Sequence, residues 1–236
     1  MTITSAHNPQ LKELRRLHRR RDRDRTQRFL AEGEDLIAAA RQATRPPLSG
    51  YRVPGSGLGS PDFIDVAGDA LAAVSTLGSG TRVIGVYAQR WAAPTGPLCL
   101  YLHGVHDPGN VGTALRSAVA LGASSVVLGP GCADPHGPKA VRASMGAIFA
   151  ASLARASGPD ELPGERIALV ARAGEPLRGP SSGPVTLCVG AERDGLPDDF
   201  VAAADRVAHI PIAGESLNAA MAATVALYEM TRVPSP

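Results

Sequence analysis

The sequence has few of the residues that stabilise secreted proteins or span membranes. It contains three cysteines, Cys99, Cys132 and Cys188, an odd number that argues against a disulfide framework and favours a reducing, cytoplasmic location. Residues 1–30 include no hydrophobic core of a signal peptide. No apolar run reaches the roughly 18 residues that a membrane span needs. These absences disfavour secreted, disulfide-rich and transmembrane proteins, and no membrane partner is expected.

The sequence also has few aromatic residues and lacks two common nucleotide-binding motifs. Aromatic residues make up only 4% of the 236 residues, which predicts a core of Ala, Val, Leu and Ile. The chain contains neither the G-x-G-x-x-G fingerprint of dinucleotide-binding proteins nor a phosphate-binding loop of the Walker type. A nucleotide cofactor, if present, must therefore be bound in another way.

Positive charge is concentrated near the N-terminus. Residues 12–28 hold nine basic and three acidic side chains, so this segment carries +6 while the net charge of the whole chain is +2. The rest of the chain therefore carries −4. A basic stripe on an otherwise mildly acidic chain favours a polyanionic partner, most often nucleic acid. The alternative is a solvated helix face. The candidate RNA-binding residues are Arg15, Arg19, Arg20 and Arg23, together with Arg142 further along the chain.

The chain is expected to form two domains. Residues 92–97 (AAPTGP) have the composition of a linker, and they separate a small domain at residues 1–92 from a larger one at 97–236. In the first part, the pattern predicts helices over 8–20, 36–40 and 69–77, strands near 29–30 and over 81–88, and a loop over the Pro- and Gly-rich residues 44–61.

The second part alternates predicted strands and helices. The predicted strands are 99–105, 124–129, 166–172, 185–190 and 206–212, and the predicted helices are 110–121, 138–155, 197–204 and 216–232. This alternation indicates an α/β fold with a mostly parallel sheet flanked by helices. Ligands of such sheets bind at the carboxyl ends of the strands.

Three glycine-containing segments follow predicted strands. The first is HDPGNVGTALRSA, with Asn110 and Arg116, and the second is GAERDGLPDDF, which begins at Gly190. The third, IPIAGESLNAAMAA, ends in a helix that Ser216 could cap, with Asn218 in its first turn. Each segment alone could be a turn or a helix cap. Together they offer many free backbone groups to a flat, polar ligand such as adenosine.

These segments resemble the three motifs of the SpoU (TrmH-type) branch of the SPOUT RNA methyltransferases. The pattern N-x-G-x-x-x-R occurs as Asn110, Gly112 and Arg116. The pattern G-x-E-x-x-G-L occurs as Gly190, Glu192, Gly195 and Leu196. The third motif occurs as Ile210, Pro211, Ile212, Gly214, Ser216, Leu217 and Asn218. Residues 138–149 resemble the segment between the first two motifs, and the basic N-terminal run resembles a ribosomal-protein-like substrate-binding domain.

The resemblance implies a methyltransferase domain with a deep trefoil knot, preceded by a small ribosomal-protein-like α/β domain. It implies S-adenosylmethionine as cofactor, a ribose 2′-hydroxyl of RNA as substrate, and a homodimer. The implied cofactor-binding residues are Gly190, Ala191, Gly195, Ile210, Pro211 and Leu217. The implied catalytic residues are Arg116, Asn110, Glu192, Ser216 and Asn218. No metal is implied.

The sequence departs from the family pattern at Ala220, where the third motif usually has a second serine, and at Ile212, where it usually has methionine. The loss of the serine leaves open a non-catalytic RNA-binding protein. A transfer RNA substrate also stays open, although the first domain favours ribosomal RNA. A weaker alternative is a hydrolase or metal enzyme that uses His103, His106 and Asp107, but His103 and His106 are spaced wrongly for one face of a strand.

Overall fold

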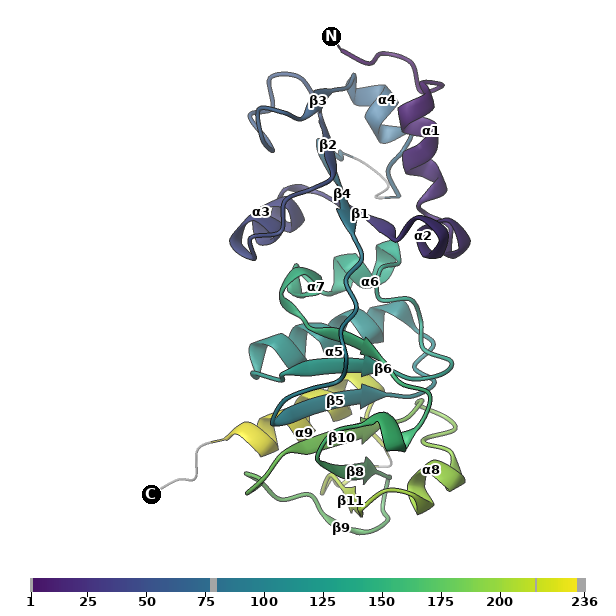
Figure 1. Ribbon diagram of the computed structural model, residues 1–236, viewed down its shortest axis with the longest axis vertical. Helices are drawn as coiled ribbons and strands as arrows, with labels where there is room; N and C mark the ends of the chain where they lie inside the picture. The colour runs from purple at the N-terminus through teal and green to yellow at the C-terminus, as the bar shows by residue number, and fades with distance from the viewer. Residues whose placement is uncertain (1, 77–79, 215, 233–236) are drawn as a thin grey trace. The chain divides into compact units, whose positions relative to one another are not determined.

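A computed structural model describes residues 2–76, 80–214 and 216–232 (Figure 1). The chain forms two compact units. The first unit comprises residues 1–89 and 134–149, and the second comprises residues 90–133 and 150–236. Residues 134–149 therefore pack with the N-terminal part of the chain, although they lie between the first and second motifs in the sequence.

The first unit is a small α/β unit built on a four-stranded sheet. Its strands have the order β1-β4-β2-β3, and only the β2–β3 pair is parallel. The strands are β1 (Arg28–Glu32), β2 (Ser49–Arg52), β3 (Ile64–Asp65) and β4 (Val83–Ala88). The helices are α1 (Pro9–Arg16), α2 (Arg20–Thr26), α3 (Glu34–Gln42), α4 (Gly68–Ala72) and α6 (Pro138–Ala143), with α7 (Ala147–Ala150) at the boundary between the units.

Leucine spacing explains how α1 packs in this unit. Leu11, Leu14 and Leu17 recur every three residues, and all three are buried in a core that includes Leu30 and Leu71. Asn8 begins α1, since its side chain accepts a hydrogen bond from the backbone N–H of Gln10. The amphipathic pattern thus buries one face of the helix and leaves the arginines on the others.

The second unit is the predicted parallel sheet. Its seven strands have the order β7-β6-β5-β10-β8-β11-β9, and every pair is parallel. The strands are β5 (Leu98–Leu102), β6 (Ser125–Leu128), β7 (Leu153–Arg155), β8 (Glu165–Leu169), β9 (Glu175–Pro176), β10 (Val185–Val189) and β11 (Arg206–His209). The helices are α5 (Pro108–Ala120), the 3-10 helix η1 (Pro159–Glu161), α8 (Asp198–Ala202) and α9 (Ala219–Thr231).

Helices cover both faces of this sheet. On one face α5 and α9 lie side by side, joined by a 2.6 Å hydrogen bond between the hydroxyls of Ser117 and Thr224 (Figure 1). On the other face Phe200 of α8 stacks on Tyr101 of β5, with 5.0 Å between the ring centroids. The central strands β5 and β10 are buried along their whole length, as continuous apolar runs predict.

Several element boundaries differ from those predicted. The predicted helix over 138–155 is broken after α6, because Met145 and Gly146 adopt left-handed backbone angles (φ 48° and 91°), and its last residues form β7. Strand β2 lies inside the predicted loop 44–61. The predicted helix over 8–20 ends at Arg16 as α1, and a second helix, α2, begins at Arg20. The predicted helix over 69–77 corresponds to α4, and residue 77 lies outside the described residues.

Candidate active site

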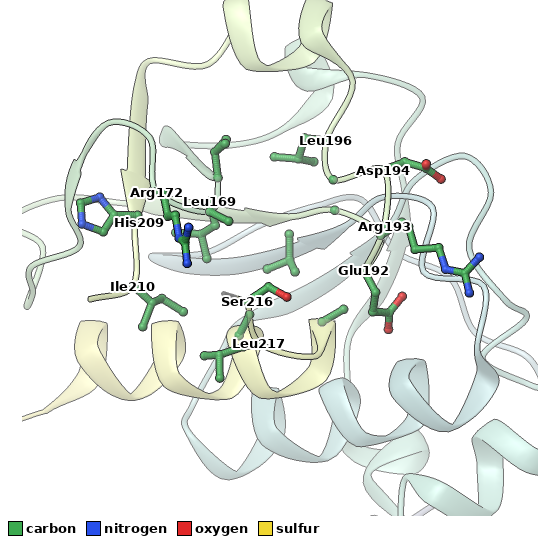
Figure 2. A pocket seen from close by; sticks show the side chains of 18 of the residues that line it. Leu169, Arg172, Glu192, Arg193, Asp194, Leu196, His209, Ile210, Ser216 and Leu217 are labelled. Atoms are coloured by element: carbon green, nitrogen blue, oxygen red, sulfur yellow. The ribbon is translucent and has the colours of Figure 1, made fainter. Parts of the chain in front are cut away.

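A pocket of about 860 Å³ lies at the carboxyl ends of β8, β10 and β11 in the second unit (Figure 2). This is the edge at which ligands of parallel sheets bind. Eight predicted site residues line it: Gly190, Ala191, Glu192, Gly195, Ile210, Pro211, Ser216 and Leu217. The second and third motifs therefore meet at one pocket, although residues 197–209 separate them in the sequence.

Gly190 is needed for the close packing of the second motif. A Cβ atom at Gly190 would lie 2.1 Å from the backbone carbon and 2.2 Å from the backbone oxygen of Gly195. The chain returns at this point in a tight loop, in which Ala191 and Gly195 exchange backbone hydrogen bonds of 3.1 and 3.0 Å. Gly195 has a left-handed φ of 68°, which glycine adopts without strain. The loop therefore places backbone atoms directly at the wall of the pocket.

A chain of hydrogen bonds connects the three motifs. The amide Nδ2 of Asn110 donates to Oε1 of Glu192, and Nδ2 of Asn218 donates to Oδ1 of Asn110 at 3.1 Å. The Oδ1 atom of Asn218 accepts hydrogen bonds from the backbone N–H groups of Ala220 and Met221 at 3.0 and 3.4 Å. Asn218 is thus the cap of α9, whereas the sequence suggested Ser216 for this role. The first turn of α9 is linked through two amides to the carboxylate of Glu192 at the pocket wall.

Ala220 occupies the position of the missing serine. Its side chain is buried, with 2% of its surface exposed, and its backbone N–H is already bonded to Asn218. Loss of the serine therefore leaves the capping of α9 intact in this chain.

Arg116 does not line the pocket. It lies on α5 six residues after Asn110, which places it about 9 Å further along the helix axis and on another face. Its side chain is exposed, and within the described part of the chain it makes no hydrogen bond or ion pair. The structure brings together the other four predicted catalytic residues, and it leaves Arg116 free on the neighbouring surface of α5.

Two residues of the weaker hydrolase or metal alternative, His103 and Asp107, have structural roles. The hydroxyl of Tyr101 is hydrogen-bonded to Nδ1 of His103 at 3.0 Å, and partial burial lowers the pKa of His103. Asp107 caps α5 by accepting a hydrogen bond from the backbone N–H of Asn110. Among the described residues, no group of three or more potential metal ligands lies together.

A hydrolase-type pattern G-x-S-x-G does occur at residues 179–183. It lies in the loop before β10, where the hydroxyl of Ser181 donates to the carbonyl of Gly183. A nucleophile elbow requires a strand-to-helix turn, and this loop does not provide one.

The candidate RNA-binding arginines fall into two groups. Arg19, Arg20 and Arg142 are exposed, and Arg15 is partly buried. Arg23, in contrast, is 4% exposed: its guanidinium forms a 2.6 Å ion pair with Asp134 and donates to the carbonyls of Leu17 and His18. Its charge is used inside the first unit, and it is not presented to an RNA phosphate.

The pocket also contains residues that the motifs did not identify. Arg172 follows β8, Arg193 and Asp194 lie in the loop after β10, and His209 ends β11 (Figure 2). The strand-end rule could have found Arg172, because it directly follows the apolar run IALVA. The three motifs could not identify Arg172, because it lies outside all of them.

A parallel α/β sheet with a ligand pocket formed by the second and third motifs is the arrangement expected of the SpoU-type methyltransferases. Comparison of the sequence with family models gives the same class. Residues 97–228 match the model of the SpoU rRNA Methylase family, and residues 8–49 match the MRM3-like substrate binding domain. The chain belongs to the SpoU rRNA methylase family. The resemblance predicted from the motifs is confirmed, and so is the α/β fold with its mostly parallel sheet. The trefoil knot stays a prediction.

Relatives match over nearly the whole chain. The 23S rRNA (guanosine(2553)-2′-O)-methyltransferase RlmP of Bacillus subtilis is 31% identical over 245 residues, which cover 97% of this chain and 98% of that protein. An AdoMet-bound rRNA methyltransferase from Sinorhizobium meliloti is 30% identical, with a TM-score of 0.86 over 98% of this chain and 97% of that one. The AdoMet complex of AviRb from Streptomyces viridochromogenes is 25% identical, with a TM-score of 0.84 over 95% and 97%.

Proposed function

We propose that the protein transfers a methyl group from S-adenosylmethionine to a ribose 2′-hydroxyl of ribosomal RNA. The observation that carries this proposal is the convergence of the three motifs, since Asn110, Glu192 and Asn218 form one hydrogen-bonded chain beside the pocket. Membership of the SpoU family supports the activity, and the 23S rRNA methyltransferase of Bacillus subtilis supports the choice of ribosomal over transfer RNA.

The residues of the pocket fit this cofactor. Gly190 allows the loop after β10 to pack closely, and Ala191, Gly195 and Pro211 line the pocket beside it. Ile210 and Leu217 add apolar surface suited to the flat face of an adenine. We assign these six residues to cofactor binding. When bound, the sulfonium supplies a methyl group that is already activated for transfer.

The remaining task of the protein is to position a poor nucleophile, so orientation dominates catalysis. The amides of Asn110 and Asn218 hold the carboxylate of Glu192 in one orientation at the pocket wall, and Ser216 offers a hydroxyl to the same space. The guanidinium of Arg116 stays protonated in proteins, so it cannot accept the proton of the 2′-hydroxyl. We assign it to holding the adjacent phosphate or stabilising the developing alkoxide.

We propose the first unit as the site that recognises RNA, with Arg15, Arg19, Arg20 and Arg142 on its surface. The proposed domains are residues 1–92 for RNA binding and 97–236 for methyl transfer. The compact units divide the chain slightly earlier, at residues 89 and 90, and assign residues 134–149 to the first unit. Arg142 lies in this returning segment, so it belongs to the same unit as the N-terminal arginines.

We further propose a homodimer in which α9 is covered by a second copy. Met221, Val225 and Tyr228 are 56%, 41% and 59% exposed, and their spacing of four and three residues places them on one helix face. An exposed apolar stripe of this kind marks an interaction surface. Sedimentation velocity of a Tyr228→Glu variant tests the dimer: a shift to monomer is expected, and an unchanged sedimentation coefficient would contradict it.

A reducing, cytoplasmic location is part of the proposal. Cys99, Cys132 and Cys188 are all free and buried, as expected of a protein that does not depend on disulfides. None of the helices within residues 2–76, 80–214 and 216–232 combines the length and the apolarity that a membrane span requires.

Calorimetric titration with S-adenosylmethionine, followed by transfer of a radiolabelled methyl group to unmodified ribosomal RNA, tests the function. Micromolar binding of the cofactor and ribose methylation are expected. An Arg116→Ala variant is expected to fold and bind the cofactor normally but to lose methyl transfer. Cofactor binding without turnover on any RNA would instead support the non-catalytic alternative, and full activity of Arg116→Ala would remove Arg116 from the mechanism.

A further inference from the structure

Arg172 stands out in the pocket because of its backbone conformation. Its φ is 61°, in the left-handed region that residues with a side chain rarely adopt. Such conformations persist where the surrounding structure holds them, and they concentrate at ligand-binding and catalytic sites. Glycine could occupy the position without strain, yet an arginine stands there, which indicates that its side chain has a role in the pocket.

The guanidinium of Arg172 has donors to spare. Its one hydrogen bond within the described residues joins Nη2 to the carbonyl of Gly214 at 3.4 Å, which is long for such a bond. A guanidinium carries five N–H donors, so most of them face the open pocket or solvent. Within residues 2–76, 80–214 and 216–232 no carboxylate forms an ion pair with Arg172.

Charge is unevenly distributed along the pocket. Glu192 and Arg172 lie on opposite sides of Ser216 in Figure 2, and Asp194 lies on the side of Glu192. Arg193 is the other arginine of the wall, and its side chain extends away from Ser216, beside these carboxylates (Figure 2). Among the described residues, the end of the pocket near Ile210 thus has a cation without a carboxylate partner, and the end near Glu192 is acidic.

We infer that Arg172 binds the α-carboxylate in the amino-acid part of the cofactor, and that it fixes the orientation of the cofactor in the pocket. This inference rests on the proposed function. The α-carboxylate is the only anionic group of S-adenosylmethionine, and a guanidinium binds a carboxylate through two parallel hydrogen bonds. The acidic end of the pocket then suits the positively charged sulfonium, which is separated from the α-carbon by two methylene groups.

The test compares two ligands that differ only in the amino-acid part. S-adenosylhomocysteine has the α-carboxylate, whereas 5′-methylthioadenosine retains the adenosine and the thioether but lacks the amino-acid part. Calorimetric titration of the full-length Arg172→Gln variant is expected to show a Kd about ten-fold higher for S-adenosylhomocysteine, the size of a solvent-accessible charged hydrogen bond. The Kd for 5′-methylthioadenosine is expected to stay within two-fold.

Two further variants make the result specific. Arg193→Gln removes the other cation of the pocket, and it is expected to leave both Kd values within two-fold. Arg172→Gly removes the side chain and relieves the left-handed strain, so it is expected to weaken S-adenosylhomocysteine equally while leaving the melting temperature unchanged or raised.

Three results would overturn the assignment: equal weakening of both ligands in Arg172→Gln, unchanged binding of S-adenosylhomocysteine in that variant, or a ten-fold effect in Arg193→Gln. Failure of the proposed function gives different results. If the pocket is not a cofactor site, the wild-type protein binds neither ligand. If only methyl transfer fails, the wild-type protein binds both ligands but does not methylate ribosomal RNA, and the comparison of the variants still decides the role of Arg172.

Discussion

Replacing Gly190 by alanine tests whether the wall of the pocket is made by close backbone packing. The new Cβ atom would lie 2.1–2.3 Å from the backbone of Gly195 and Leu196, whereas ordinary contacts begin near 3.4 Å. The loop after β10 must therefore retreat by more than ~1 Å. Overpacking of this kind costs about 1–3 kcal/mol. Each kcal/mol lowers the melting temperature of a domain of this size by roughly 2–4 °C.

The retreating loop is the one that lines the pocket, so binding is expected to suffer as well as stability. Calorimetric titration with S-adenosylmethionine should show a Kd about ten-fold higher for Gly190→Ala than for the wild-type protein, because a wall displaced by about 1 Å loses close contacts with the ligand, and about 1.4 kcal/mol of lost contact energy raises the Kd ten-fold. Thermal unfolding of the same samples measures the loss of stability.

Gly164→Ala is the matched control. Its Cβ atom would lie 2.4 Å from the backbone oxygen of Pro184, so the clash is of the same kind. Gly164 and Pro184 precede β8 and β10, whereas Gly190 follows β10, so the control clash lies at the opposite edge of the sheet from the pocket. Gly164→Ala is expected to lower the melting temperature and to leave the Kd unchanged. If both variants bind S-adenosylmethionine like the wild type, or both lose it equally, the reasoning about Gly190 is refuted.

Three further predictions concern the cap of α9, the ion pair of Arg23 and the basic surface of the first unit. Asn218→Asp keeps the oxygen that caps α9 but removes the N–H donor to Asn110, so the free energy of unfolding should be nearly unchanged while the rate of methyl transfer falls. Asn218→Ala removes the cap as well, so it should also lower the free energy of unfolding by about 1 kcal/mol. Arg23→Ala removes the cation paired with the largely buried Asp134, which keeps a hydrogen bond from the backbone N–H of His136, so chemical denaturation should show a loss of about 3 kcal/mol; wild-type stability would contradict the structural role of Arg23. RNA affinity should fall steeply with salt in filter-binding assays, and Arg20→Ala should reduce the slope of log K against log salt by about one; a flat dependence would exclude phosphate binding by this surface.

The sheet of the second unit could be predicted because its strands carry their own signal. The segment that became β5 is a continuous apolar run, and β10 is interrupted only by Thr186; burial on both faces favours such runs. Strand β7 escaped prediction because Leu153–Arg155 follows an alanine-rich stretch with helical composition. Its start depends on the left-handed turn at Met145 and Gly146, and Gly146 is required there because a Cβ atom would lie 2.3 Å from that of Ala39. This contact joins residues more than a hundred positions apart, so local sequence could not reveal it.

Strand β2 illustrates the same limit in the first unit. Proline and glycine around it predict a loop, yet Gly50 lies in a buried strand. The ring of Phe63 packs so closely on Gly50 that a Cβ atom would lie 2.3 Å from it. The glycine that argued against a strand is therefore the residue that allows the aromatic ring to cover it.

The motifs identified most residues of the candidate site, but they could not say how these residues act on one another. The order of the motifs in the sequence does not show that Asn110 joins Glu192 to Asn218, because that depends on β5 and β10 being neighbours in the sheet. Charge density suggested Arg23 as an RNA ligand, and only the fold shows that Asp134 returns to pair with it. Arg172 lies outside all three motifs, and its left-handed backbone has no signature in the sequence.

Ala220, which replaces the usual serine of the third motif, leaves the cap of α9 intact. A serine side chain there could only supplement a cap that Asn218 already provides, since Asn218 accepts from two N–H groups of the first turn of α9. The same asparagine donates to Asn110, so one residue both starts the helix and orients the amide that holds Glu192. Helix α9 and the site are therefore coupled through Asn218. The chain can lose the serine and keep the arrangement, whereas it cannot lose Asn218 without disturbing both.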